Sequence, residues 1–175
     1  LEKIATLDTV VLDKTGTLTI GKPSVTDVFV LPGFDERQVL SLASGLEISS
    51  EHPLAEAVVE KARSHGLSIP AASEFLAVPG RGIEGRVEGR SVFIGAEVYL
   101  REKGVVVDGL RAMASTFASS GKTPILVAID GRPAAVIGVA DTLKPNAAGA
   151  VAPVFKASRR SRARRNSPRP PDSAW

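Results

Sequence analysis

The segment from Val10 to Thr19 constrains the fold of this chain more than any other part of the sequence. It begins with apolar, β-branched residues and changes abruptly at Asp13 into small polar ones. This pattern is typical of a buried parallel strand that ends in an active-site loop, because open α/β sheets place their ligands at the carboxyl ends of strands. A carboxylate in such a loop can attack a phosphoryl group, whereas a lone Asp after a strand more often closes an Asx turn. The segment therefore predicts an α/β fold, with either a nucleophile or a turn residue at Asp13.

Five residues of this segment, Asp13-Lys14-Thr15-Gly16-Thr17, resemble the phosphorylation motif of P-type ATPases without a substitution. The resemblance implies that Asp13 accepts the γ-phosphoryl group of ATP and that Lys14 neutralises the developing charge. It also implies that Asp13 and the carbonyl of Thr15 hold Mg²⁺. The wider haloacid dehalogenase-like superfamily often has a second Asp, a general acid/base, where this chain has Thr15. A phosphoenzyme of this chain should therefore hydrolyse slowly, which suits an ion pump better than a phosphatase.

The composition bounds the size and chemistry of the chain. Its 175 residues, 43% of them hydrophobic, suffice for one or two small domains with a core. No apolar run approaches the ~18 residues of a membrane-spanning helix, and no signal peptide is expected. Because there are no Cys residues, disulfides and Cys-based metal sites are excluded within the chain.

The net charge of +3 comes from the end of the chain. Residues 153–175 hold seven cations and one anion, and the remaining 15 cations and 18 anions give the rest of the chain a net charge of −3. The basic pI therefore does not indicate that the folded part binds nucleic acid.

Two hinge-like segments, at residues 19–23 and 140–145, bracket a β-rich part of the chain. Residues 1–21 are expected to begin a phosphorylation domain, residues 22–139 to form an inserted nucleotide-binding domain, and residues 140–152 to resume the first domain incompletely. P-type ATPases share this plan. The expected fold class is α/β with an α+β insert: a partial haloacid dehalogenase-like phosphorylation domain and an inserted antiparallel sheet flanked by helices.

The secondary structure of the insert follows from periodicity and from turn residues. Apolar residues at helical spacing predict helices over residues 35–44, 53–65, 97–103 and 109–120, with a further helix starting at residue 146. β-branched runs predict strands over residues 24–31, 74–78, 83–87, 91–94, 125–129 and 134–139. Glu88-Gly89 and Asp130-Gly131 are expected to be hairpin turns.

The segment Ser50-Glu51-His52-Pro53 resembles a motif of the heavy-metal branch of the P-type ATPases. Taken alone, a His beside a Pro at a helix start is usually a partly exposed cap. In the heavy-metal branch the Glu five residues before the His-Pro pair contacts adenine, and the His orients the nucleotide. The resemblance therefore implies that Glu47 and His52 bind the base of ATP. A carboxylate can accept from the exocyclic amine, and an imidazole can stack on the base or hydrogen-bond to it.

The segment Gly80-Arg81-Gly82-Ile83-Glu84-Gly85 matches the pattern Gly-x-Gly-x-x-Gly. It follows Pro79 and enters a predicted hairpin instead of a helix, so a Rossmann motif is excluded. The residues alone favour a tight turn and nucleotide binding equally. In the heavy-metal branch the equivalent glycines let the backbone approach the nucleotide, which implies this role for Gly80 and Gly82. Arg81 either meets a phosphate or is solvated.

Two other segments differ from nucleotide-binding patterns. The family usually has Gly-Asn where this chain has Gly95-Ala96. Gly95 still permits close approach to the nucleotide, but Ala96 lacks the amide, so a reduced affinity is expected. Gly121-Lys122-Thr123 matches a family segment but lacks the glycine spacing of a Walker A loop, so it is not expected to be a P-loop.

The resemblance covers residues 1–152. A complete phosphorylation domain would continue to a strand ending in Thr-Gly-Asp and to a Gly-Asp-Gly segment with a second Mg²⁺-binding carboxylate, and this sequence shows neither. Residues 153–175 are rich in Arg, Ser and Pro and are expected to be disordered. A frame-shifted ending is one hypothesis for this tail, and a basic arm for nucleic acid or acidic lipid is the other.

Together these patterns favour the ATP-binding and phosphorylation-site portion of a heavy-metal-transporting P-type ATPase. The cofactors implied are ATP and Mg²⁺. The parent pump would lie in a membrane with this soluble portion on the cytoplasmic face, and membrane helices outside the chain would bind the metal. Copper is favoured over zinc or cadmium. The alternatives are a nucleotide-binding module with an idle Asp13 and a soluble haloacid dehalogenase-like phosphatase.

Overall fold

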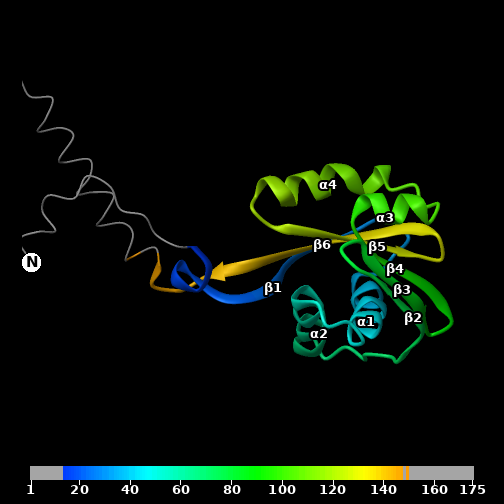
Figure 1. The fold of residues 1–175 in the computed structure, drawn as a ribbon, viewed down its shortest axis with the longest axis horizontal. Helices are drawn as coiled ribbons and strands as arrows, with labels where there is room; N and C mark the ends of the chain where they lie inside the picture. Colours follow the sequence, from blue (N-terminus) through cyan, green and yellow to red (C-terminus); the bar gives the residue numbers. More distant parts are fainter. Residues whose placement is uncertain (1–13, 148, 150–175) are drawn as a thin grey trace, which may run out of the picture. The chain divides into compact units, whose positions relative to one another are not determined.

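The computed structural model describes residues 14–147 and residue 149, which belong to two compact units (Figure 1). One unit consists of Leu1–Lys22 and Thr142–Trp175, and the other consists of Pro23–Asp141. The described residues of the first unit include η2 (Lys14–Leu18), a five-residue π-helical turn. Those of the second unit carry the candidate site.

Six strands of the described residues form one sheet in the order β1-β6-β5-β4-β3-β2. The neighbours from β2 to β6 pair antiparallel. The hydroxyl of Ser24 donates to the carbonyl of Ala140 and that of Thr26 to the carbonyl of Gly138, so β1 and β6 also run antiparallel. The antiparallel sheet of the expected fold class is confirmed. The strands are β1 (Thr19–Val30), β2 (Ala72–Val78), β3 (Gly82–Val87), β4 (Arg90–Gly95), β5 (Thr123–Ile129) and β6 (Arg132–Leu143).

Helices cover both faces of this sheet, as expected (Figure 1). One face packs against α1 and α2, and the other packs against α3 and α4. The carboxylate of Asp35 caps α1 by accepting a hydrogen bond from the Gln38 N–H at 2.9 Å. The helices are α1 (Glu36–Glu47), α2 (Pro53–Ser64), α3 (Glu97–Glu102) and α4 (Asp108–Ser119).

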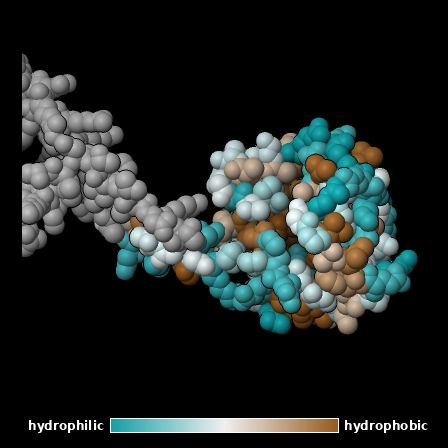
Figure 2. Space-filling view, in the orientation of Figure 1, coloured by the Kyte–Doolittle hydropathy of each residue, from teal (hydrophilic) through white to brown (hydrophobic). Residues whose placement is uncertain are grey.

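Strand β5 shows why the sheet is buried on both faces. Ile125, Val127 and Ile129 join the hydrophobic cluster beneath α1, whereas Leu126 and Ala128 join the cluster beneath α3 and α4. Successive side chains of a strand point to opposite faces, so a central strand between two helix layers needs apolar residues at every position. On the visible outer surface, hydrophobic side chains are scattered among hydrophilic ones (Figure 2).

The two predicted hairpin turns are confirmed. Glu88 and Gly89 have φ values of 50° and 76°, and Asp130 and Gly131 have values of 51° and 71°. Positive φ at both central residues is the geometry of type I′ turns, whose twist matches that of the flanking strands. These turns join β3 to β4 and β5 to β6.

The boundaries between the two units fall after Lys22 and after Asp141, within the two segments predicted as hinges, although most residues of these segments lie in strands. Residues 19–23 belong to β1, and residues 140–143 belong to β6. Gly21 and Pro23 suggested a break, but β1 lies at the edge of the sheet, where a Pro removes no hydrogen bond that the sheet needs.

The predicted helix over residues 35–44 ends three residues too early. Helix α1 continues to Glu47, with Gly45 inside it. A Cβ on Gly45 would lie 2.5 Å from the carbonyl oxygen of Pro70 and 2.8 Å from Cγ1 of Val87. Gly45 is thus a packing glycine that lets a loop approach the helix, and the extra turn carries Glu47 into the candidate site.

Three predicted features lie wholly or largely outside the described residues: the strand before Asp13, the helix that starts at residue 146 and the tail over residues 153–175. Within the described part, no helix is both long enough and apolar enough to cross a membrane.

Candidate functional site

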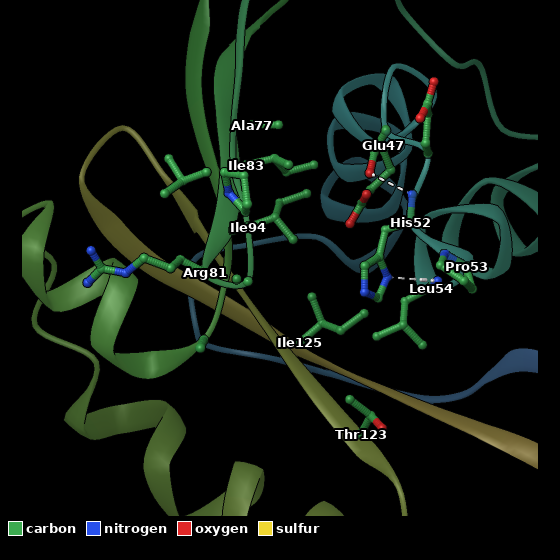
Figure 3. A pocket seen from close by; sticks show the side chains of 18 of the residues that line it. Glu47, His52, Pro53, Leu54, Ala77, Arg81, Ile83, Ile94, Thr123 and Ile125 are labelled. Carbon is green, nitrogen blue, oxygen red and sulfur yellow. Dashed lines mark hydrogen bonds between the residues drawn. The ribbon is translucent and has the colours of Figure 1, made fainter.

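A cavity of about 600 Å³ lies at one end of the sheet, between the α1–α2 connection and the ends of β2, β3, β4 and β5 (Figure 3). The residues predicted from the sequence to bind a nucleotide are far apart in the chain, but the structure brings all of them together in the lining of this cavity. They are Glu47, His52, Gly80, Gly82 and Gly95.

Glu47 places a buried carboxyl group in the cavity wall. The residue is 6% exposed, and it is the one buried Asp, Glu, His, Lys or Arg among the described residues. Burial raises the pKa of Glu47 to about 7, although a hydrogen bond from the Ser50 side chain acts in the opposite direction. A buried carboxyl with a strongly shifted pKa in a cavity is a frequent property of functional sites.

His52 is both the cap of a helix and part of the cavity. Its Nδ1 accepts a hydrogen bond from the Leu54 N–H at 3.1 Å and so caps α2, and Pro53 occupies the first helical position (Figure 3). Because Nδ1 is the acceptor, the neutral imidazole carries its proton on Nε2. The exposed ring therefore offers an N–H donor and an aromatic face at the cavity. The capping role and the binding role are compatible in one side chain.

Gly80 lies in the turn between β2 and β3. The Arg81 N–H donates to the Val78 carbonyl at 3.0 Å, which closes a four-residue turn with Pro79 and Gly80 at its centre. Gly80 has φ of +71°, which a residue with a side chain rarely adopts, and a Cβ there would meet nothing within 4 Å. The turn thus presents bare backbone at the cavity rim.

Gly82 and Gly95 are required by packing behind the cavity wall. They are directly paired between β3 and β4. A Cβ on Gly82 would lie 2.5 Å from Cδ1 of Tyr99, and a Cβ on Gly95 would lie 2.8 Å from the Cα of Gly82. Their missing side chains therefore face α3, and what they contribute to the cavity is backbone.

The cavity wall presents little positive charge. Arg81 is the one Lys or Arg among its lining residues. The guanidinium of Arg81 pairs with the carboxylate of Glu102 and extends away from Glu47 and His52 (Figure 3). Of the two readings of Arg81, a phosphate contact or a solvated side chain, the pairing with Glu102 favours the second.

The sequence interpretation missed the apolar part of the wall. Ile83, Ile94 and Ile125 line the cavity from three neighbouring strands, with Leu54 from α2 (Figure 3). Strand alternation could have placed the three Ile residues on one face, but only the pairing order of the strands brings them next to one another. A carboxyl, an imidazole and an apolar wall together suit a planar heteroaromatic ring better than a polyphosphate.

Ala96 also lines the cavity and occupies the N-cap position of α3. It makes no side-chain capping hydrogen bond. An Asn at this position, as in the family pattern, would supply both a cap and an amide at the cavity edge.

The segment Gly121-Lys122-Thr123 forms a helix ending, as expected for a segment that is not a P-loop. The Gly121 N–H donates to Ala118 and the Lys122 N–H donates to Phe117, both at 3.0 Å, so the segment closes the C-terminus of α4. A phosphate-binding loop precedes a helix and presents N–H groups, whereas this segment follows one. Thr123 lines the cavity, and Lys122 pairs with Asp27.

The predicted phosphorylation residues belong to the other unit of the chain. Asp13 lies outside the described residues, and Lys14 and Thr15 begin η2. Lys144 approaches this turn: its backbone N–H donates to the Leu18 carbonyl at 2.9 Å, and its ammonium group donates to the Gly16 carbonyl at 2.5 Å. Residues after β6 thus lie beside the residues that follow Asp13.

Comparisons with known proteins agree with this arrangement. A model of the haloacid dehalogenase-like hydrolases matches residues 7–153. The chain is 44% identical over 144 residues to copper-transporting ATPase 2 of Rhizobium meliloti (strain 1021), which covers 82% of this chain and 17% of that protein. It is 42% identical over 144 residues to the silver exporting P-type ATPase of Salmonella typhimurium, with 82% and 18% covered. The chain thus spans about a fifth of the length of the curated relatives that it matches.

Solved structures give the same result. A zinc-transporting PIB-type ATPase in its E2.Pi state superposes with a TM-score of 0.74 and 35% identity, over 83% of this chain and 23% of that one. The N-domain of HMA6, a copper-transporting P-type ATPase, superposes with a TM-score of 0.57 and 28% identity, over 67% of this chain and 98% of that domain. The resemblance read from the motifs is confirmed. The chain belongs to the haloacid dehalogenase-like hydrolase family, and the relatives that it matches in that family are metal-transporting P-type ATPases.

Proposed function

We propose that this chain binds ATP, with the base in the cavity between Glu47 and the turn at Gly80. The observation that carries this proposal is the buried carboxyl of Glu47 in a largely apolar wall. A carboxylate at that place accepts a hydrogen bond from the exocyclic amine of adenine. Removing this carboxylate from water costs free energy unless a ligand or a neighbouring group forms a hydrogen bond with it.

The other parts of the wall fit the same ligand. The imidazole of His52 supplies an aromatic face and the Nε2–H donor, and the side chains of Ile83, Ile94 and Ile125 supply apolar surface for the base. The backbone at Gly80 allows close approach, and the backbone of Gly82 and Gly95 lines the cavity. The volume of about 600 Å³ lies within the usual range of small-molecule sites. Because Arg81 is paired with Glu102, the phosphates extend out of the cavity in this proposal.

The phosphorylation step rests on the sequence motif and on the relatives. Asp13 attacks the γ-phosphorus of ATP, a carboxylate oxygen forms the new bond, and the bond to ADP breaks. Lys14 neutralises the charge that develops. Asp13 and the carbonyl of Thr15 would hold Mg²⁺, which would supply further charge neutralisation.

The relatives suggest which process this phosphorylation would drive in an intact pump. In an intact pump it would drive the export of a heavy-metal ion that is bound by membrane helices. The relatives at 38% to 44% identity are named for copper or silver, so we favour copper as the transported metal, with zinc or cadmium as the alternatives. The binding partners proposed for the pump are thus ATP and this metal ion.

Substitution of His52 by Asn tests the nucleotide site. The Asn side chain can still cap α2, but it removes the aromatic face and the Nε2–H donor. We expect the free energy of unfolding to stay within about 0.5 kcal/mol of wild type, and ATP affinity to fall about tenfold, which corresponds to about 1.4 kcal/mol. Calorimetric titration with ATP and urea denaturation measure the two quantities.

Asp35→Ala is the matched control for His52→Asn. It removes the cap of α1 at the other end of that helix from the cavity. It should cost about 1 kcal/mol of stability and leave ATP affinity unchanged. Wild-type affinity in His52→Asn would rule out the assignment of His52.

A phosphorylation assay distinguishes a portion of a pump from the two alternatives, a binding-only module and a phosphatase. With labelled ATP and Mg²⁺, we expect an acid-stable, hydroxylamine-labile label that is lost in Asp13→Asn, because an aspartyl phosphate has those properties. Nucleotide binding without a label would favour a binding-only module. Phosphate release from small phosphomonoesters would favour a phosphatase. This alternative is consistent with the match to the haloacid dehalogenase-like hydrolases.

A further inference from the structure

The backbone of Gly82 and Gly95 forms one wall of the cavity, called the glycine wall below. Tyr99 lies directly behind this wall. It is 2% exposed and belongs to the hydrophobic cluster on the α3 side of the sheet. Atoms of its ring lie 2.5 and 2.8 Å from the position that a Cβ of Gly82 would take, and 3.1 Å from the corresponding position at Gly95. The ring therefore fills the space that two missing side chains leave on the face away from the cavity.

Polar contacts fix this ring. The Tyr99 hydroxyl donates to the Glu84 carboxylate at 2.8 Å, and the ammonium group of Lys103 pairs with the same carboxylate at 2.6 Å. Lys103 also lies over the Tyr99 ring, 5.5 Å from its centre. Hydrogen bonding and charge from Lys103 hold the pKa of Glu84 below its ordinary value, and burial raises that of Tyr99. The phenol therefore stays a donor and the carboxylate stays an acceptor throughout the neutral range.

Helix α3, which carries Tyr99, also contacts the turn between β2 and β3. The Ala96 N–H donates to the Arg81 carbonyl at 3.1 Å, immediately before α3 begins. The guanidinium of Arg81 pairs with Glu102 at the end of α3. Helix α3 thus contacts the turn between β2 and β3 at both of its ends, and Tyr99 contacts the glycine pair from its middle.

A wall made of glycine backbone has no side chains of its own to set its position. The residues that pack against the back of Gly82 and Gly95 therefore help to set the distance of this backbone from Glu47 and His52. We propose that Tyr99 is a positioning residue for nucleotide binding, acting through Gly82 and Gly95 to set the position of this wall. The inference rests on the proposed function, since it concerns affinity at the same cavity.

Two leucine substitutions on the same face of the sheet test this role. Phe117 packs on Gly138 much as Tyr99 packs on Gly82, with a hypothetical Cβ of Gly138 lying 3.0 Å from its ring. Gly138 belongs to β6, which contributes no residue to the lining of the cavity. Tyr99→Leu and Phe117→Leu therefore remove comparable aromatic contacts, one behind the cavity wall and one elsewhere.

We expect both leucine variants to unfold at lower temperatures than wild type. Calorimetric titration should give an ATP affinity lowered about tenfold or more in Tyr99→Leu, and within about twofold of wild type in Phe117→Leu. Tyr99→Phe keeps the ring and should lose about two- to threefold. Equal affinity losses in the two leucine variants, or wild-type affinity in Tyr99→Leu, would overturn the role of Tyr99.

A second measurement covers the case in which Tyr99→Leu does not fold. In Tyr99→Phe, hydrogen exchange at the amides of Arg81 and Ala96 should be faster than in wild type, while that of Ile137 in β6 stays the same. Unchanged exchange at Arg81 and Ala96 would also overturn the inference. Failure of wild-type protein to bind ATP at all would instead refute the proposed function, so the two failures are distinguishable.

Discussion

Glu47→Gln is expected to raise the free energy of unfolding at pH 8 by up to about 3 kcal/mol. Burial raises the pKa of Glu47 from 4.5 to about 7 in the folded protein. Between these values the folded state binds more protons than the unfolded state, so the wild-type protein loses stability as pH rises through 7. Gln does not ionise and avoids this loss. The pKa difference corresponds to roughly 3 kcal/mol, at about 1.36 kcal/mol per pH unit.

The increase in the free energy of unfolding caused by Glu47→Gln should therefore depend on pH. Urea denaturation of both proteins should give nearly equal free energies at pH 4, and curves that separate mainly as the pH rises from 4.5 to 7. Glu51→Gln is the matched control, because Glu51 also lines the cavity but is exposed. Its effect should stay within about 0.5 kcal/mol at every pH. Parallel profiles for wild type and Glu47→Gln would contradict the burial of a carboxyl at this site.

The same substitution should weaken ATP binding. A charged acceptor forms a stronger hydrogen bond than a neutral amide, so a loss of about fivefold to tenfold is expected at pH 8. Wild-type affinity should fall as pH drops from 8 to 6 and Glu47 becomes protonated, by more than that of Glu47→Gln over the same range. Because ATP itself titrates there, the difference between the two proteins is the relevant quantity. A variant that is more stable and binds less well is typical of a site whose function costs stability.

Gly82→Ala is expected to destabilise the protein by about 3 kcal/mol. The new Cβ would overlap the carbonyl oxygen of Ile94 in the paired strand and lie 2.5 Å from the Tyr99 ring. Neither neighbour moves without disturbing the sheet or the α3 layer. Gly80→Ala is the control from the same turn: its Cβ meets open space, so only the strain of φ at +71° remains, worth about 1 to 2 kcal/mol.

Urea denaturation of the two alanine variants measures this difference. A larger loss for Gly82 than for Gly80 supports close packing behind the wall. Equal losses, or a larger loss at Gly80, would mean that backbone conformation and not packing requires these glycines.

Much of the fold of the insert could be predicted because local signals agreed with the tertiary structure. The dipeptides Glu88-Gly89 and Asp130-Gly131 set both hairpins, since their positive φ values suit only a few residue types. The prediction was wrong where one residue type serves two purposes. The predicted helix over residues 35–44 stopped before Gly45, yet Gly45 lies inside α1, where it allows contact with Pro70. Pro23 was predicted to belong to a hinge, and it lies at the boundary between the two units but within the edge strand β1.

The candidate site was predictable only through resemblance to a family. Nothing in local sequence indicates that Glu47 is buried, because its burial depends on the α1–α2 connection meeting the ends of four strands. The resemblance did identify Gly82, but not the reason for it. Its lack of a Cβ accommodates Tyr99 on the opposite face, a contact 17 residues away in sequence that no short motif encodes.

Mapping the amide signals of the isotopically labelled protein during titration with a non-hydrolysable ATP analogue tests the nucleotide site most directly. We predict perturbations at Glu47, Ser50 and His52, at Gly80 and Gly82, and at Gly95, with little change in the hairpin at Asp130-Gly131 at the opposite end of β5. No perturbation at millimolar analogue, or perturbations centred away from the cavity, would contradict nucleotide binding at this site.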